Sequence, residues 1–139
     1  MGQKKKKVKR KTLVKKLDTA FSKYIRWRDA DTDGYVKCST CEAVKPVDKM
    51  QCGHFMSRRY HSLRWHKYGN CNPQCYGCNI MDQGRQYVHS KYIDKRYGKG
   101  TAEELLKRSK EKRKYNNEEL IQLTKYYNSK VNEYTNKHS

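Results

Sequence analysis

The chain has 139 residues and a formal net charge of +19, from 33 Lys and Arg against 14 Asp and Glu, and only 35% of its residues are hydrophobic. That length allows one domain with tails rather than two full domains, and so polar a chain cannot bury a large apolar core. The positive charge would repel itself in a compact fold unless a polyanion neutralised it, which predicts a nucleic-acid partner. We expect no membrane partner, because no apolar stretch reaches spanning length and no secretory segment follows Met1, and we place the protein in the reducing cytoplasm.

The N-terminal segment 1–11 is the most basic part of the chain. Every residue from Lys4 to Lys11 is a Lys or Arg except Val8. Such a run repels itself, so the composition predicts a disordered basic arm. We expect the arm to contact DNA phosphates, although a solubilising tail or an import signal would have the same composition.

Residues 12–29 have the periodicity of an amphipathic helix with a basic outer side. Its apolar positions fall on one helical face: Leu13, Leu17, Phe21, Tyr24 and Ile25. The acidic segment 29–34 then resembles the start of a calcium-binding loop, but Thr40 stands where that loop needs a bidentate glutamate. An acidic turn with a positive φ at Gly34 is the favoured interpretation.

Two CxxC pairs, Cys38–Cys41 and Cys75–Cys78, enclose the central segment of the chain. Each pair brings two thiolates to one side of a metal, and paired motifs at this spacing predict a tetrahedral structural Zn²⁺ site. Short strands are expected at 35–37 and 50–55, with a loop around 45–46 between them. Cys52 and Cys71 remain outside the motifs; they could pair or approach a site, but buried thiols are favoured.

The long loop that follows interleaves cations with aromatic residues, Tyr60, Trp65 and Tyr68. Cations can hold phosphates while aromatic rings stack on bases or sugars, so the loop is a candidate DNA contact. The alternative is a solvated loop whose aromatic residues cover the zinc site. The candidate DNA-binding residues are Arg58, Arg59, Arg64 and Lys67.

The C-terminal part of the chain is expected to be helical. A helix should begin after Cys78 and pause at Gly84 before it stops at Gly98, a good C-cap. Thr101 with Glu104 predicts a capping box for a helix through about Lys112. Asn116 with Glu119 predicts another helix, with an apolar stripe from 120 to 134 typical of core packing or a helix–helix contact. The predicted organisation is therefore a basic arm at 1–11, a zinc-bound core with an N-terminal helix at 12–98, and a helical extension at 99–139.

His54, Asn70 and Asn79 supply residue types suited to phosphodiester hydrolysis. A neutral histidine can act as a general base near pH 7, because its free pKa is about 6.5. An asparagine oxygen is a hard ligand suited to Mg²⁺ or Mn²⁺, whereas thiolates suit zinc. The segment thus predicts two metal environments: zinc on the four cysteines, and a catalytic divalent ion at Asn79.

With these residues in order, the segment resembles an HNH (ββα-metal) nuclease. The resemblance implies an α+β fold with a small zinc-stabilised ββα-metal core and flanking N- and C-terminal helices. It makes His54 the general base, Asn70 the loop brace and Asn79 the helical metal ligand. A more specific resemblance is to the phage NinG (Rap) family of recombination endonucleases, which act on branched DNA. It is carried by residues 21–29, the two CxxC pairs, Gly53-His54-Phe55, residues 63–65, Asn70, Gln74, Asn79 and Gly84, and weakly by 118–127.

One position departs from the nuclease pattern. Many HNH sites have an acidic metal ligand just before the base, where this chain has Gly53. The ion then relies on phosphate oxygens and water, or another residue contributes, with Gln51, Cys52, Asp48 and Asp82 as candidates. The remaining histidines fit no such pattern and are expected at the surface: His61, His66, His89 and His138.

The resemblance predicts a metal-dependent endonuclease that cleaves Holliday junctions or D-loops and leaves 5′-phosphate and 3′-hydroxyl ends. Paired cuts on a junction would favour a homodimer formed through the C-terminal helices. Two alternatives remain open at this point. One is a non-catalytic zinc-ribbon protein that binds nucleic acid by charge, and the other is a generic HNH nicking or restriction nuclease.

Overall fold

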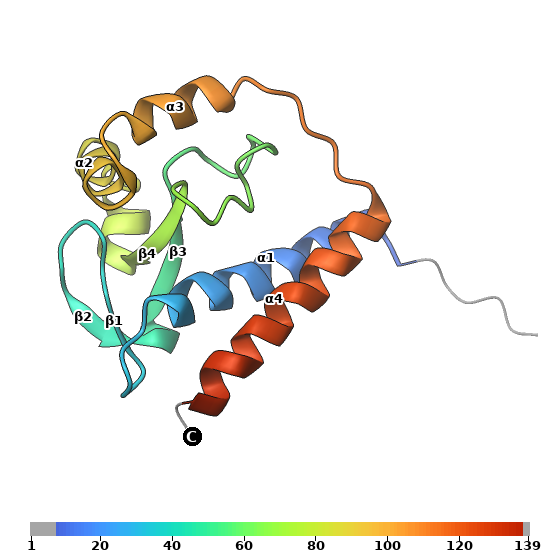
Figure 1. Cartoon of the computed structure of the whole chain (residues 1–139), viewed down its shortest axis with the longest axis horizontal. Coiled ribbons are helices and arrows are strands. Elements are labelled where there is room, and N and C mark those ends of the chain that lie inside the picture. The colour runs from blue at the N-terminus through green and yellow to red at the C-terminus, as the bar shows by residue number, and fades with distance from the viewer. Residues whose placement is uncertain (1–7, 138–139) are drawn as a thin grey trace, which may run out of the picture.

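The computed structural model describes residues 8–137. Figure 1 shows two hairpins and the short helices gathered on one side of a crossed pair of long helices, α1 and α4. Most of the predicted basic arm lies at 1–7, outside the described residues, and α1 already includes the last two residues of that prediction. The elements in order are α1 (Arg10–Arg28), β1 (Tyr35–Lys37), β2 (Val44–Pro46), the 3₁₀ turn η1 (Val47–Lys49), β3 (Met50–His54), β4 (Cys71–Cys75), the π-helical turn η2 (Gly77–Met81), α2 (Gln86–Tyr97), α3 (Thr101–Arg108) and α4 (Asn117–Lys137).

The strands form two separate two-stranded antiparallel sheets, β1–β2 and β3–β4. In the first, Tyr35 pairs with Pro46. In the second, Met50 pairs with Cys75 and His54 pairs with Cys71. The α+β class is confirmed, but the sequence analysis missed β2 and β4. Segment 45–46 is a strand rather than a loop, and β4 escaped notice because it is polar and contains a proline.

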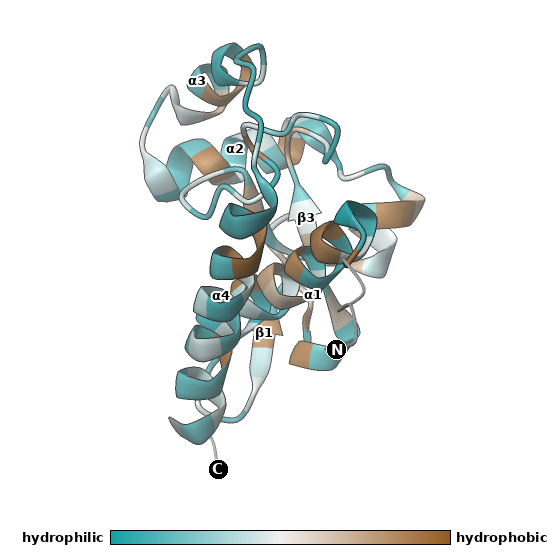
Figure 2. Cartoon of the chain, turned by 90° about the vertical axis from the view of Figure 1, so that its right-hand side faces the viewer, coloured by the Kyte–Doolittle hydropathy of each residue, from teal (hydrophilic) through white to brown (hydrophobic). Residues whose placement is uncertain are grey.

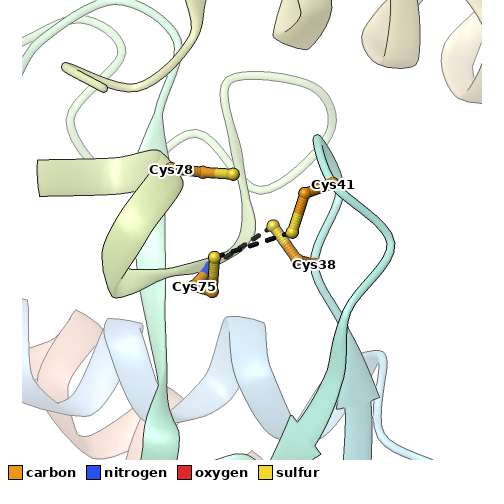
Figure 3. Close-up of side chains that lie close together, drawn as sticks. All are labelled: Cys38, Cys41, Cys75 and Cys78. Atoms are coloured by element: carbon orange, nitrogen blue, oxygen red, sulfur yellow. Dashed lines mark hydrogen bonds between the residues drawn. The ribbon is translucent and has the colours of Figure 1, made fainter. Parts of the chain in front are cut away.

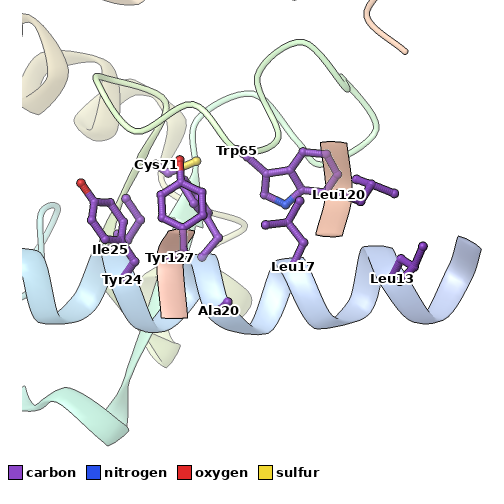
Figure 4. Packing of buried hydrophobic residues seen from close by; sticks show 10 residues of the cluster. Leu13, Leu17, Ala20, Tyr24, Ile25, Trp65, Cys71, Leu120 and Tyr127 are labelled. Atoms are coloured by element: carbon purple, nitrogen blue, oxygen red, sulfur yellow. The ribbon is translucent and has the colours of Figure 1, made fainter. Parts of the chain in front are cut away.

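The largest apolar cluster lies between α1 and α4, as Figure 4 shows for the side chains of Leu17, Tyr24, Trp65 and Tyr127. The amphipathic face predicted for α1 is buried there, and the apolar stripe of α4 is buried against it. The Tyr127 ring meets the Phe21 ring edge-on, with centroids 5.0 Å apart, a geometry that aromatic pairs favour. The α4 stripe therefore packs within its own chain.

The start of α4 confirms the capping box predicted there. The Asn116 Oδ1 accepts a hydrogen bond from the Glu119 backbone N–H at 2.8 Å, and Glu119 accepts one from the Asn116 N–H at 3.2 Å. The capping box predicted at Thr101 was wrong. Thr101 is already helical, Gly100 precedes it with φ +91°, and the Thr101 hydroxyl donates to the Gly98 carbonyl at 2.7 Å. That helix also ends earlier than expected, at Arg108.

The acidic turn between α1 and β1 is confirmed. Gly34 has φ +81°, and the Asp31 carboxylate accepts the backbone N–H groups of Asp33 and Tyr35 at 2.9 and 3.0 Å. Asp29 instead receives the Arg96 guanidinium of α2 at 2.7 Å. The carboxylates thus serve the turn itself and the attachment of α2 to the end of α1.

Every residue of β4 is buried, and the two amides in the strand and the one just before it hold the surrounding segments in place. Asn70, just before the strand, hydrogen-bonds the loop that begins at Met56. Asn72 accepts the Tyr97 hydroxyl at 3.0 Å, and Gln74 donates to the Gly84 carbonyl at 2.9 Å. Most of the buried amide groups in this strand region find a partner, as buried polar groups need to, but the Gln74 Oε1 is buried without one.

His89 on α2 corrects the expectation that the remaining histidines lie at the surface. Its side chain is completely buried, and its Nε2 lies 3.1 Å from the Asn72 Nδ2. His66 is half-buried beside Arg108, whereas His61 is exposed. His138 lies outside the described residues.

None of the helices within residues 8–137 is both long enough and apolar enough to cross a membrane. Most of the α4 ribbon in Figure 2 is hydrophilic, with hydrophobic colour confined to a small part of it. The predicted absence of a spanning segment is therefore confirmed for the described helices.

We expect His89 to make the fold sensitive to acid. Burial, with a smaller contribution from the charge of His54, lowers the His89 pKa from 6.5 to about 4. The unfolded chain then takes up the proton at a higher pH than the folded chain, so the free energy of unfolding falls as the pH drops from about 6.5 to about 4. Between pH 7 and pH 5 the loss attributable to His89 should be about 2 kcal/mol.

Urea unfolding at pH 7 and pH 5 measures this loss in the wild type, in His89→Gln and in His61→Gln. The His89 variant should show a smaller difference between the two pH values, whereas the exposed His61 serves as the control and should behave as the wild type. Equal pH dependence in all three proteins would contradict the assignment.

Candidate metal centre and histidine cavity

Four cysteine side chains converge where the two hairpins meet. Cys38 and Cys41 lie in the turn after β1, and Cys75 and Cys78 lie at the end of β4 and in η2, with their sulfur atoms directed toward one another in Figure 3. All four Sγ atoms lie within 4.8 Å of one another, and the Cys41 and Cys75 Sγ atoms are 3.7 Å apart. Two ligands of a tetrahedral zinc with Zn–S of about 2.3 Å stand about 3.8 Å apart. The predicted ligand set is brought together, and it could hold a structural metal such as zinc.

The surroundings of the sulfur atoms also fit a cation. Burial raises the pKa of the Cys38 thiol, but hydrogen bonds from the Thr40 hydroxyl and the Cys75 backbone N–H outweigh this and lower it to about 6. A backbone hydrogen bond at Ala43 lowers the pKa of Cys41, yet burial and the neighbouring sulfur atoms together raise it to about 12. The Cys38 thiolate therefore forms readily, whereas the Cys41 thiolate needs a positive charge nearby. A divalent ion supplies that charge, because ligand thiols are bound deprotonated.

His54 ends β3 and faces a cavity of about 480 Å³. Its Nε2 lies 2.9 Å from the Arg64 carbonyl oxygen, so this nitrogen carries the proton and Nδ1 keeps the lone pair. Burial lowers the pKa of His54 from its usual 6.5, although the hydrogen bond to Arg64 acts in the opposite direction. The imidazole is therefore oriented by the backbone and is neutral near pH 7.

Asn79 lines the same cavity from η2. Its Nδ2 donates to the Gln51 Oε1 at 2.7 Å, which leaves the Asn79 carbonyl oxygen as the end available to a cation. The helix predicted from Cys78 to Gly98 is interrupted near Gly84, as expected, so Asn79 belongs to a separate short turn rather than to α2.

Asn70 lies beneath this site rather than in it. Its side chain is completely buried. Its Oδ1 accepts the Met56 backbone N–H at 2.8 Å, and its Nδ2 donates to the carbonyls of Met56 and Leu63 at 3.1 and 3.0 Å. Asn70, at the end of the loop that begins just after His54, thus holds the start and the middle of that loop in place.

The structure gives a physical reason for the glycine that precedes His54. A Cβ atom at Gly53 would lie 2.0 Å from the Gln74 Oε1, and the rest of the Gln74 side chain is almost as close. The Gln74 amide is held by the Thr40 hydroxyl and the Gly84 carbonyl. Position 53 therefore has no room for the acidic residue that many HNH sites carry there.

The four candidate DNA-binding residues differ in the solvent exposure of their charged groups and in whether those groups already have a partner. Arg58 is 60% exposed at the rim of the cavity, although its guanidinium lies 3.5 Å from the Asp18 carboxylate. The exposed Arg59 has its guanidinium 4.8 Å from the Tyr60 ring centroid. Lys67 lies over the Tyr126 ring and donates to its hydroxyl at 3.2 Å. Arg64 is only 17% exposed and forms an ion pair with Asp18.

Asp18 is a site residue that the sequence analysis missed. Its carboxylate accepts hydrogen bonds from the Arg64 Nε and the Trp65 Nε1, both at 3.0 Å, and it lines the cavity with His54. A lone carboxylate in the otherwise basic helix α1 was the available signal. Among the acidic candidates named from sequence, Asp48 lines a separate groove beside Trp27 and Val47, and Asp82 is exposed at the end of η2.

Cys52 and Cys71 also lie near His54. Cys71 is completely buried in the cluster between α1 and α4, and Cys52 is half-buried against that cluster. Burial and the neighbouring Cys52 raise the pKa of the Cys71 thiol well above its ordinary value. The expectation of a buried thiol holds for Cys71, and both cysteines approach the histidine.

These features define a small α+β protein with a candidate four-cysteine metal centre and a histidine-lined cavity beside it. The chain belongs to the NinG family: the family described as Bacteriophage Lambda NinG protein matches residues 1–137. Comparisons with curated proteins and with solved structures give no match.

Metal removal should unfold the region where the hairpins meet. Structural zinc supplies on the order of 10–16 kcal/mol of apparent folding free energy near neutral pH. The exposed Cys41 is a suitable position to change. Cys41→Ser is expected to lose the zinc that the wild type retains through dialysis and to melt at a lower temperature.

Elemental analysis and thermal circular dichroism, with and without a zinc chelator, measure both effects. The chelator should destabilise the wild type and have little further effect on the variant. Equal zinc content and equal melting temperature in the two proteins would exclude the four cysteines as the metal site.

Proposed function

We propose that the protein is a metal-dependent DNA endonuclease of the HNH (ββα-metal) type. The observation that carries the proposal is that His54 and Asn79, from different elements, line one cavity. Residues of β3 and η2 line that cavity together with α1, and β4 pairs with β3; this supports the strand–strand–helix plan that the sequence resemblance implies. In this proposal zinc on the four cysteines holds the two hairpins together.

In the proposed reaction His54 removes a proton from the attacking water. Three features suit it to that role: the Arg64 carbonyl orients the ring, the lone pair remains on Nδ1, and burial disfavours the charged form. A general base of this kind contributes roughly 100- to 10,000-fold to rate. Asn70 contributes by holding the loop that carries Arg58 and by fixing the chain on both sides of it.

In the proposal Asn79 offers its amide oxygen to a Mg²⁺ or Mn²⁺ ion. The hydrogen bond from the Asn79 Nδ2 to Gln51 engages the nitrogen end of the amide and leaves that oxygen for the ion. When bound, the ion supplies charge stabilisation at the phosphate and at the departing 3′ oxygen. Cleavage on that side of the phosphate leaves 5′-phosphate and 3′-hydroxyl ends.

The proposed DNA contacts come from the exposed cations near the cavity. Arg58 and Arg59 lie in the loop directly after His54, and Arg58 reaches the cavity rim. Arg64 acts instead as a positioning residue, because its ion pair with Asp18 ties the loop to α1. Counterion release by such contacts supplies sequence-independent affinity.

Family membership supports branched recombination DNA, such as Holliday junctions or D-loops, as the substrate. Incubation of the purified protein with a four-way junction and with a linear duplex of the same sequence, with and without Mg²⁺ or Mn²⁺, tests this. Metal-dependent cutting of the junction alone supports the full proposal, and equal cutting of both supports a generic HNH nuclease. Salt-sensitive binding without any cut product supports the non-catalytic zinc-ribbon alternative.

Substitution of the base should remove cleavage without removing binding. His54→Ala is expected to cut the junction about 100- to 10,000-fold more slowly than the wild type, because it lacks the proton acceptor. The variant should keep the zinc of the four-cysteine centre and bind the junction with nearly unchanged affinity. His61→Ala, at an exposed histidine in the same loop region, is the matched control and should cut normally. A His54 variant that cuts as well as this control would eliminate His54 as the base.

The pH profile of cleavage gives a second test of the same role. Because burial lowers the His54 pKa from 6.5, the imidazole stays neutral and active somewhat below that pH. The single-turnover rate should therefore be level from about pH 8 down to about pH 6.5 and fall tenfold per pH unit only at lower pH. A midpoint for this loss above pH 6.5 would show that a different group, or a differently placed histidine, acts as the base.

A further inference from the structure

A second group of metal-ligating side chains lies beside the proposed catalytic residues: Cys52, His54 and Cys71, whose ligand atoms all lie within 4.8 Å of one another. The strand register explains the grouping. His54 pairs with Cys71 across the β3–β4 hairpin, and Cys52 precedes His54 by two residues on β3. Side chains with these relations share one face of a sheet, here the face that packs on α1.

The ligand atoms of this group, like those of the four-cysteine centre, all lie within 4.8 Å of one another. Two ligand atoms on a tetrahedral zinc stand about 3.5–3.8 Å apart, given bonds of about 2.0–2.3 Å. Shifts of about 1 Å or less would thus bring the two sulfurs and one imidazole nitrogen to bonding distance. Thiolate and imidazole are ligands that Zn²⁺ favours over the hard cations.

The groups around the cluster resemble the outer partners of a metal site. A histidine ligand commonly donates its other ring N–H to a backbone carbonyl, which fixes the tautomer and raises the basicity of the ligand nitrogen. The His54 Nε2 has that partner in the Arg64 carbonyl, at 2.9 Å. The Cys71 Sγ has the Asn70 Nδ2 at 3.8 Å, a donor that would favour a thiolate. Its thiol also lies 3.7 and 3.9 Å from the Arg64 and Leu63 carbonyl oxygens, so a bound cation would have to displace the thiol proton.

The cluster is also open on one side. Cys71 is completely buried, whereas Cys52 and His54 both line the cavity of about 480 Å³. An ion held by these three side chains would have its remaining coordination position directed to the cavity. Two cysteines and one histidine with an open position form a ligand set that zinc accepts.

We propose that Cys52, His54 and Cys71 form a second site, distinct from the four-cysteine centre, for a thiophilic divalent cation such as Zn²⁺. The site also has a regulatory consequence, which rests on the proposed function. An ion bound there takes the imidazole lone pair that His54 needs as a base. Zinc at this site therefore inhibits cleavage that Mg²⁺ or Mn²⁺ supports.

Cobalt substitution of the full-length protein tests the site without reference to activity. Protein kept reduced with a phosphine and titrated with Co²⁺ should bind two equivalents per chain, each with sulfur-to-cobalt charge-transfer absorption. Cys52→Ser and Cys71→Ser should each bind one equivalent, and the band that disappears should be the one from the weaker site. Cys41→Ser, which alters the other centre, should lose the tighter equivalent.

A wild type that binds a single equivalent, or Cys52 and Cys71 variants that both still bind two, would overturn the site. Two variants are used because Cys71 lies in the apolar core, and circular dichroism of each cobalt-loaded protein shows whether it is folded. If one variant fails to fold, the number of Co²⁺ equivalents bound by the other variant decides whether the second site exists.

Inhibition is measured separately, with junction DNA and Mg²⁺. Filling the second site with Zn²⁺ should slow the wild type by about 100-fold, the lower range expected for loss of a general base. Cys71→Ser should cut with Mg²⁺ and resist this inhibition. Wild-type protein that binds two cobalt ions but never cuts DNA refutes the proposed function and leaves the metal site standing. Protein that cuts equally with one or two zinc ions bound refutes the regulatory role.

Discussion

The convergence of four sulfur atoms is the interaction on which the remaining structure depends. The two hairpins pair only within themselves, so no continuous sheet joins β1–β2 to β3–β4. Between them lie the cysteine cluster, a small apolar cluster that includes Val36 and Met50, and a few hydrogen bonds, such as that from the Ser39 N–H to the Pro73 carbonyl at 2.8 Å. A metal among the sulfurs would fix the end of β4, and with it the turn that carries Asn79. A chain with few apolar residues gains from such a centre the cohesion that its core does not supply.

Buried amides extend this order from the cysteines to the cavity. Along the β4 region, amide residues alternate with cysteine and proline: Asn70, Asn72 and Gln74. The side chain of each forms hydrogen bonds with a different segment. Satisfied polar groups in an interior specify one arrangement, because any other leaves a donor or acceptor unpaired. This network also restricts the residues around His54. The Gln74 side chain fills the space next to Gly53 and leaves no room for a carboxylate at that position. The same residue that secures Gly84 thus shapes the ligand set around His54.

The sequence predicts those features that depend on neighbouring residues or on a regular spacing of residues along the chain. The helical stripes of α1 and α4, the turn at Gly34 and the four cysteines have periodicities or spacings that depend little on the rest of the fold. β4 has no such pattern, because its sequence Cys-Asn-Pro-Gln-Cys is polar and its burial comes from partners far away in the chain. The pairing of Arg64 with Asp18 and the burial of His89 are likewise long-range results. A cation-rich loop looks uniformly available to DNA until the tertiary structure shows which guanidinium is already neutralised.

Among the described residues that line the cavity, none offers a free carboxylate, and this bears on how the proposed catalytic ion would bind. Asp18 lines the cavity, but its oxygens already accept hydrogen bonds from Arg64 and Trp65, and Gly53 excludes an acidic neighbour of His54. Mg²⁺ dehydrates reluctantly and is usually bound through carboxylates together with substrate phosphates. In the proposed reaction a single amide oxygen on Asn79 would give the ion little affinity, so most of the negative charge that holds it would come from DNA. Binding of a hard ion and of DNA would then reinforce each other by the same coupling free energy in both directions. A thiophilic ion at the proposed site of Cys52, His54 and Cys71 would need no such help, and it would therefore compete best for the imidazole when DNA is absent.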